Sequence, residues 1–82
     1  MDRQIAEGQI REIEETLFLG YREDAYMLLK EYAGIEAKPY IAWDFYDESG
    51  NCVGNSQDYS IRDLILEACV HIVKEAGDES QN

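Results

Sequence analysis

Acidic and aromatic side chains occur together in one segment of the chain, between Lys38 and Arg62. The segment contains no basic residue, so its carboxylates have no oppositely charged neighbour nearby in the sequence. Carboxylates can bind metal ions, act as acid–base groups in catalysis, or contact Lys and Arg side chains of another protein. The side chains that we predict to form a binding site are Tyr40, Asp44, Tyr46, Asp47, Glu48, Asp58 and Tyr59.

A calcium-binding loop is the first chemistry to test against this segment. Asp47, Ser49 and Asn51 stand at alternate positions, as the ligands of such a loop do, and Asp58 stands twelfth. The loop requires glycine at its sixth position, where this chain has Cys52, and Glu at its twelfth. We therefore predict an ordinary hairpin turn at these residues, with no metal site and no cofactor.

The chain offers little for nucleophilic or acid–base catalysis. His71 is its only histidine and lies two residues from Cys69, and side chains two apart on a helix do not face each other. Neither Cys69 nor Cys52 has a basic neighbour in the sequence that would activate its thiol, so we expect reduced, buried and inert cysteines. Carboxylate pairs such as Glu14 with Glu15 are expected by composition alone. The sequence therefore predicts a protein that is not an enzyme.

The overall composition indicates a folded protein with an acidic surface. Its 82 residues include 18 Asp and Glu against seven Lys and Arg, a formal net charge of −11, yet 45 % of them are hydrophobic. Disordered acidic tails lack the aromatic and branched residues that offset chain entropy, and this chain has both. Nucleic acids and anionic membranes attract Lys- and Arg-rich patches, so we expect neither as a direct partner.

We expect a single domain over residues 1–77 and a flexible tail over residues 78–82, because no linker-like stretch divides the chain. The first residues lack the basic and apolar regions of a signal peptide. No apolar run approaches the roughly 18 residues that a membrane span needs. The predicted location is therefore the cytoplasm.

An apolar repeat predicts a helix at the start of the chain. The repeat has three- to four-residue spacing after its first member and consists of Ile5, Ile10, Ile13 and Leu17. The helix covers residues 2–19, and Gly20 is placed to cap its C-terminus. The alternative is a short strand over residues 16–21, which the β-favouring side chains there permit and the upstream periodicity disfavours.

A second helix and a β-hairpin follow. The helix begins near residue 22, where acidic side chains suit the positive end of its dipole, and it ends at Gly34. Pro39 marks the start of a strand with period-two alternation, and a short returning strand begins at Cys52. The side chains that we place on the inner face of the first strand are Ile41, Trp43 and Phe45. The outer edge of the hairpin stays open to a partner strand.

The last predicted helix is the core of the domain. Ser60 is its N-cap, with Asp63 three residues further on, and Gly77 ends it. Its apolar stripe consists of Ile61, Leu64, Ile65, Ala68, Ile72, Val73 and Ala76. Leu66, Cys69 and Val70 widen that stripe beyond one face, so part of it is available for contact between two copies of the chain. His71 is expected on the solvent side, between Glu67 and Glu75.

These elements predict an α+β fold with two N-terminal helices, a short β-hairpin and a C-terminal core helix. With alternate residues of the strand facing inward, Tyr40, Asp44 and Tyr46 share its outer face and form an aromatic surface around a carboxylate. Tyrosine is common in protein interfaces, because it buries a large area and keeps a polar tip. The alternative is that Tyr40 and Tyr46 cover a neighbouring helix.

Two hypotheses for function follow. In size and charge the chain resembles small acidic phage or mobile-element proteins that inhibit host nucleases, restriction systems or CRISPR effectors. The resemblance implies a non-enzymatic protein that mimics DNA and occludes the basic, nucleic-acid-binding surface of a partner protein. The alternative is a homodimeric structural or regulatory module, joined through the last helix or the hairpin edge.

Overall fold

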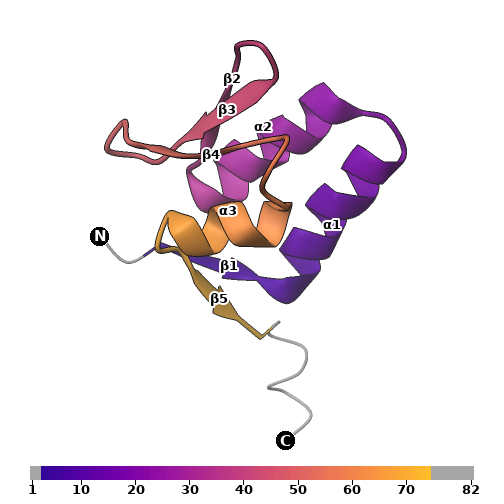
Figure 1. Cartoon of the computed structure of the whole chain (residues 1–82). Coiled ribbons are helices and arrows are strands. Elements are labelled where there is room, and N and C mark those ends of the chain that lie inside the picture. Colours follow the sequence, from indigo (N-terminus) through magenta and orange to yellow (C-terminus); the bar gives the residue numbers. More distant parts are fainter. Residues whose placement is uncertain (1–2, 75–82) are drawn as a thin grey trace, which may run out of the picture.

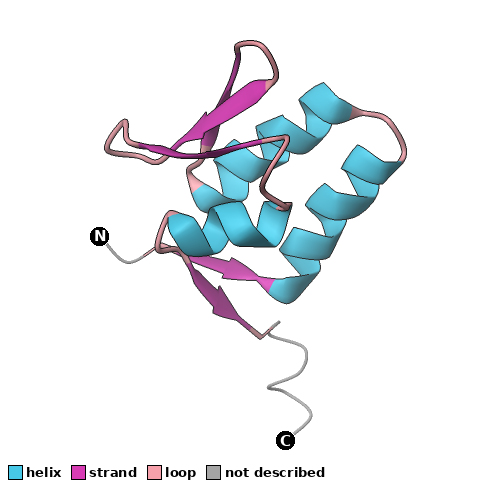
Figure 2. Ribbon diagram, viewed as in Figure 1, coloured by secondary structure: helices cyan, strands magenta, loops and turns pink. Residues whose placement is uncertain are grey.

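The chain folds as an α+β domain, which confirms the predicted fold class. The computed structural model describes residues 3–74, and within them three helices and five strands surround one apolar core. Figures 1 and 2 show the two longer helices side by side, with the third helix and two small sheets against them. The predicted tail, residues 78–82, lies outside the described residues.

Helices α1 (Glu7–Phe18) and α2 (Arg22–Ala33) pack against each other and are joined by a short turn. Their apolar residues recur every three or four positions, so each helix buries one face. A hydrogen bond from the Tyr32 hydroxyl to Glu12 Oε1, 2.9 Å long, joins the two helices at their surface. As predicted, α2 ends at Gly34, whose φ of 71° is the left-handed conformation that glycine adopts without a steric penalty.

Strand β1 (Gln4–Ala6) takes residues that the sequence predicted as the start of the first helix. It pairs in parallel with β5 (His71–Val73), at the other end of the described chain. Gln9 then fixes the start of α1, because its side-chain oxygen accepts the backbone N–H of the last residue of β1 at 2.9 Å. The predicted start at residue 2 is wrong, since a strand partner distant in sequence holds these residues extended. Ile5 is buried on a strand and not on a helix.

Strands β2 (Glu36–Pro39), β3 (Trp43–Tyr46) and β4 (Cys52–Asn55) form an antiparallel sheet in that order. The predicted hairpin corresponds to β3 and β4, and the sequence did not reveal β2. Phe45 on the inner face of β3 is 1 % exposed and lies opposite Ala37 of β2. The sheet therefore covers the core with one face only.

Pro39 ends β2 and does not begin a strand as predicted. An edge strand tolerates proline, because one side of it has no partner that needs the missing N–H. The Tyr40 N–H donates to the carbonyl oxygen of Ala42 at 2.8 Å and closes a tight turn into β3. Ile41 lies in this turn and is 86 % exposed, so its predicted inward position is wrong.

Helix α3 (Ile61–Glu67) is shorter than predicted. Ser60 caps it as expected, since its Oγ accepts the backbone N–H of Asp63 at 3.2 Å. Cys69 then adopts a left-handed φ of 61° and the chain enters β5, so the predicted continuation of the helix through residues 68–74 is wrong. The residues at 70, 72 and 73 are β-branched, and such side chains favour an extended strand where a partner strand is present. The predicted helix end, Gly77, lies outside the described residues.

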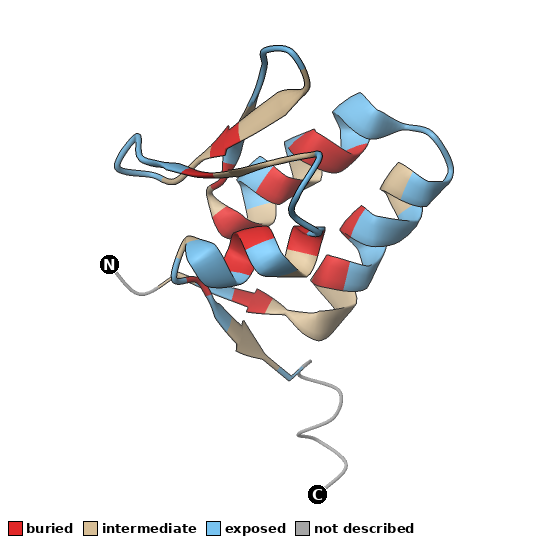
Figure 3. Ribbon diagram, viewed as in Figure 1, coloured by how far each residue is buried: buried red, intermediate tan, exposed pale blue. Residues whose placement is uncertain are grey.

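The core lies between the helix pair, α3 and the inner face of the larger sheet (Figure 3). Its largest fully buried side chains are Phe45, Ile5, Ile10, Ile13, Leu29, Ile35, Leu64 and Ile65. Tyr26 of α2 contacts the rings of Trp43 and Phe45 edge to face, with centroids 5.1 Å apart in each pair. Such edge-to-face pairs add stability beyond the buried area, so they fix the sheet on α2.

An ion pair ties the start of α1 to the first turn of α3. Arg62 Nη2 lies 2.7 Å from Glu7 Oε1, and Arg62 Nη1 lies 3.1 Å from Glu7 Oε2. The hydrogen bond from Arg62 is the main reason that the pKa of Glu7 lies below its usual value. Two parallel hydrogen bonds fix both distance and orientation, so this pair sets how the two helices meet.

Candidate functional site

The seven side chains of the predicted binding site do not gather on one face. Tyr40 lies in the β2–β3 turn and is 77 % exposed, so it covers no neighbouring helix. Asp44 and Tyr46 share the outer face of β3, as predicted. The remaining four divide between the β3–β4 turn, which holds Asp47 and Glu48, and the segment before α3, which holds Asp58 and Tyr59.

The outer face of β3 is less acidic than the sequence indicated. Strand β2 places Lys38 directly opposite Asp44. The Lys38 Nζ also lies 5.2 Å from the centroid of the Tyr46 ring, within the range of a cation–π contact. The sheet therefore adds a cation to the face of β3 that carries Asp44 and Tyr46.

Asp58 and Tyr59 shape the connection between β4 and α3. Asn55 Oδ1 accepts the backbone N–H groups of Gln57 and Asp58 at 2.9 and 3.0 Å, and Asn55 Nδ2 donates to Asp58 Oδ2 at 3.3 Å. The Tyr59 ring lies against Gly54, where an added Cβ would stand 2.8 Å from the ring Cγ. Both residues therefore have a local structural role.

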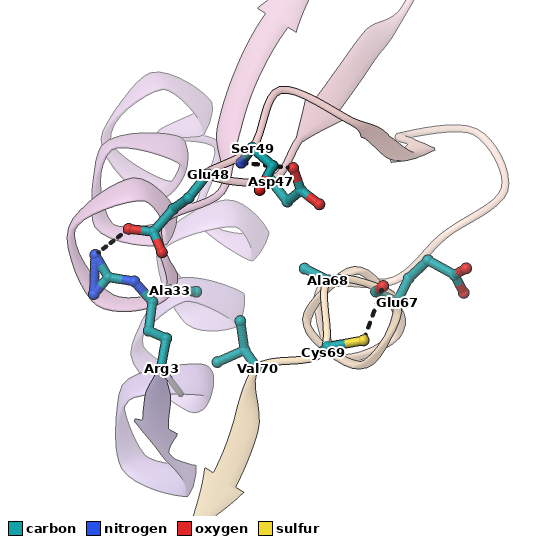
Figure 4. Close-up of a pocket in the computed structure, with 9 residues that line it drawn as sticks. All are labelled: Arg3, Ala33, Asp47, Glu48, Ser49, Glu67, Ala68, Cys69 and Val70. Carbon is teal, nitrogen blue, oxygen red and sulfur yellow. Dashed lines mark hydrogen bonds and ion pairs between the residues drawn. The ribbon is translucent and has the colours of Figure 1, made fainter. Parts of the chain in front are cut away.

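A hollow of about 520 Å³ opens beside the β3–β4 turn (Figure 4). It separates this turn from the C-terminal end of α3 and from the start of β5. Its lining includes Arg3, Asp47, Glu48, Ser49, Glu67 and Cys69, and we call this feature the acidic hollow. It combines two predicted site residues with two charged residues, Arg3 and Glu67, that the sequence did not place in a site.

Arg3 forms one side of the acidic hollow. Its Nη2 lies 3.1 Å from Glu48 Oε2, while its Nε is buried and has no hydrogen-bond partner among residues 3–74. Gly34 leaves room for this pair, since a Cβ there would stand 2.5 Å from Arg3 Nε and 2.8 Å from Glu48 Cδ. Within the described part of the chain the buried Nε is therefore left without a hydrogen bond, although Nη2 contacts Glu48.

The other two carboxylates of the acidic hollow have no cation in the described part of the chain. Asp47 Oδ1 accepts the backbone N–H groups of Ser49 and Asn51, each at 2.9 Å, which fixes the carboxylate in the turn. Neither Asp47 nor Glu67 forms an ion pair within residues 3–74. Figure 4 shows both carboxylates on the side away from Arg3. Three carboxylates and one guanidinium therefore surround the hollow, and the local charge is negative.

The shortened helix explains why Glu67 was missed. On the predicted longer helix, Glu67 would lie one turn from His71, on the solvent side. In the structure the helix ends at Glu67 and His71 belongs to β5, although His71 is exposed as expected. Cys69 and Cys52 are exposed free thiols, which corrects the prediction that both are buried. No local sequence signal marks the left-handed conformation of Cys69.

Within residues 3–74 no group of three or more His, Cys, Asp or Glu side chains is arranged to hold a metal ion. None of the helices in that range combines the length and the apolar character needed to cross a membrane. No protein-family model matches the chain, and neither a curated protein nor a solved structure matches it.

Proposed function

We propose that this protein is a small, non-enzymatic binding protein of the cytoplasm that covers a basic surface of a partner protein. The acidic hollow is the observation that carries this proposal, because two of its carboxylates lack a cation in the described part of the chain. A Lys or Arg side chain of the partner supplies the missing charge. The partner that suits such a surface best binds nucleic acid itself, as do the targets of acidic phage and mobile-element inhibitors.

Charge on the rest of the domain adds to the attraction. Exposed carboxylates without an ion pair in residues 3–74 occur on all three helices, including Glu15, Glu31 and Asp63. A net charge of −11 speeds the encounter with a basic protein and repels nucleic acid. The Debye length falls from about 8 Å at physiological ionic strength to about 3 Å at 1 M salt, so the association must weaken as salt rises.

Arg3 determines which carboxylates of the acidic hollow are available to a cation of the partner. It already neutralises Glu48, so an incoming cation meets Asp47 and Glu67 and leaves Glu48 paired. Charges at the rim of an interface act mainly on the association rate, whereas desolvated charge pairs act on dissociation and on discrimination between partners. We therefore expect the two unpaired carboxylates to carry the specific contact and the helix surfaces to carry the long-range attraction.

The test is an affinity capture from cells that naturally make the protein, at low and at high salt. Asp47→Asn with Glu67→Gln removes two charges from the acidic hollow, and Asn keeps the turn acceptor. Glu15→Gln with Glu31→Gln removes two charges elsewhere and is the matched control. We expect the first variant to lose a basic partner that the control retains. Equal retention by both variants, or a partner without a basic surface, contradicts the proposal.

The homodimeric alternative depended on the breadth of the predicted last helix or on the open edge of the predicted hairpin. In the structure Ile61, Leu64 and Ile65 are buried inside the domain, while Leu66 is 56 % exposed. The edges of the larger sheet, β2 and β4, have no partner strand within residues 3–74. Dimerisation through these elements stays a prediction, and sedimentation equilibrium over a range of protein concentrations tests it.

A further inference from the structure

An apolar groove lies between α2 and the larger sheet, and it shares no lining residue with the acidic hollow. Tyr26 and Met27 of α2 line one side, and Ala37 and Trp43 of the sheet line the other. The edge-to-face contact between Tyr26 and Trp43 fixes the position of both rings. Met27 is 68 % exposed although it is apolar and unbranched. We call this feature the α2–sheet groove.

The size of the α2–sheet groove favours a side chain of another protein, and not a small metabolite, as its occupant. Its volume is about 260 Å³, below the roughly 300–1,000 Å³ of typical small-molecule pockets. The lining is mostly apolar, and it combines a Trp, a Tyr and a flexible Met, which are residue types enriched at protein interfaces. Tyr40 and Ile41, both largely exposed, lie in the β2–β3 turn just before Trp43 in the sequence.

Charge at the rim indicates the chemistry of the occupant. Glu23 and Glu36 border the α2–sheet groove, and the one cation there, Lys30, lies 4.0 Å from Glu36. The other carboxylate at the rim, that of Glu23, forms no ion pair within residues 3–74. A second copy of this chain would bring its own net charge of −11 to the same surface, which opposes self-association.

We infer that the α2–sheet groove receives an apolar side chain from a Lys- and Arg-rich segment of the partner protein. This inference rests on the proposed function and adds an apolar anchor to it. The basic residues of the segment contact the acidic rim and surface, while the anchor lies between Met27 and Trp43. A protected apolar contact at the centre of an interface dominates binding energy, and surrounding charges contribute less each.

Two synthetic peptides provide the probe. The first is a helical peptide of Lys and Leu with one apolar face, and the second has every Leu replaced by Ala at the same charge. Trp43 is the only tryptophan of the chain and lines the groove, so its fluorescence reports occupancy. We expect the Leu-containing peptide to bind at least about tenfold more tightly than the Ala-containing one and to change the Trp43 emission.

Met27→Glu separates apolar docking from electrostatic attraction. It adds a negative charge, so attraction alone predicts tighter binding of the Leu-containing peptide, whereas docking in the groove predicts about tenfold weaker binding. Leu66→Glu adds the same charge on α3, outside the groove, and is the control. Weaker binding in Met27→Glu alone supports the inference. Both side chains are largely exposed, so neither change disturbs the core.

The outcomes distinguish the two proposals. Equal, salt-sensitive binding of both peptides with unchanged Trp43 emission overturns the inference and leaves the proposed function standing. Failure of both peptides to bind at low salt overturns both. Equal effects of Met27→Glu and Leu66→Glu, or tighter binding by Met27→Glu, also overturn the inference. If the Trp43 response is lost because the protein self-associates, as detected by sedimentation, the occupant of the groove is a second copy of the chain. That result overturns the inference as well.

Discussion

Replacement of Arg3 by Met tests the electrostatics of the acidic hollow. The ion pair that is lost has side chains 34 % and 51 % exposed, and pairs of this exposure contribute about 0.2–1 kcal/mol. The change also removes a buried Nε that has no partner among residues 3–74, and the desolvation of such a group costs about 1–3 kcal/mol. Methionine keeps an unbranched apolar stem in the same space. We therefore expect Arg3→Met to unfold in urea with a free energy equal to or above that of the wild type.

The same substitution strengthens binding to a basic probe. Consider a peptide cation that binds about 8 Å from the position of the Arg3 guanidinium, at an effective dielectric constant between about 20 and 80. Removal of the Arg3 charge then lowers the repulsion of that cation by roughly 0.5–2 kcal/mol. That corresponds to about 2- to 30-fold tighter binding of the Lys- and Ala-containing peptide at low salt. Arg22→Met makes the same charge change on exposed α2, outside the hollow, and we expect a smaller gain from it.

Two results would refute this reasoning. The first is a free energy of unfolding in urea, followed by Trp43 fluorescence, that is more than about 1 kcal/mol lower in Arg3→Met than in the wild type. That result would show that the Arg3–Glu48 pair holds the fold together. Binding that is unchanged or weaker in Arg3→Met, as measured by isothermal titration calorimetry, would show that Arg3 does not compete with an incoming cation. Circular dichroism of the variant checks that the helices are retained.

Three further substitutions test how the scaffold positions the site. The pKa of Glu7 is lowered in the folded state, so its contact with Arg62 stabilises the fold at pH values above the unfolded pKa near 4.5. This stabilisation is lost as the pH falls through the folded pKa. Glu7→Gln should therefore be less stable than the wild type at pH 7, and urea titrations at decreasing pH should show the difference vanish; a constant difference contradicts it. Phe45→Ala should cost about 3–5 kcal/mol, because the ring is fully buried, and a fall of only a few degrees in Tm would argue against that packing. Gly54→Ala should cost about 1–3 kcal/mol, since its Cβ would lie 2.8 Å from Leu64 Cδ2, and unchanged thermal unfolding would count against this contact.

The sequence predicted those elements that local signals define. The repeat in α1, the Gly34 cap of α2, the Ser60 cap of α3 and the turn after Asp47 were all correctly placed. Each depends on residues within about one or two helical turns of one another, so spacing and residue type carry enough information. The fold class followed from these elements.

Long-range pairing accounts for the errors. Strands β1 and β5 lie at opposite ends of the described chain and pair only in the folded state, so their residues were predicted as helix. Because α3 ends at Glu67, this residue lies at the hollow beside the β3–β4 turn, and Arg3 lines the same hollow. No local sequence pattern indicates that these residues lie near the turn. Likewise β2 placed Lys38 opposite Asp44. The sequence thus predicted the turn that holds Asp47 and Glu48 but not the charged residues that lie near it.

Photo-crosslinking from the acidic hollow tests the central claim most directly. Ser49 is exposed at the hollow, and a benzoylphenylalanine there keeps the backbone N–H that Asp47 accepts. In cells that naturally make the protein, we predict an adduct to a Lys- or Arg-rich surface, mapped by mass spectrometry. Combining the probe with Asp47→Asn and Glu67→Gln should abolish it. An adduct that survives these changes, or equal adducts from the same probe at Glu15, would contradict the claim that the acidic hollow binds a basic partner.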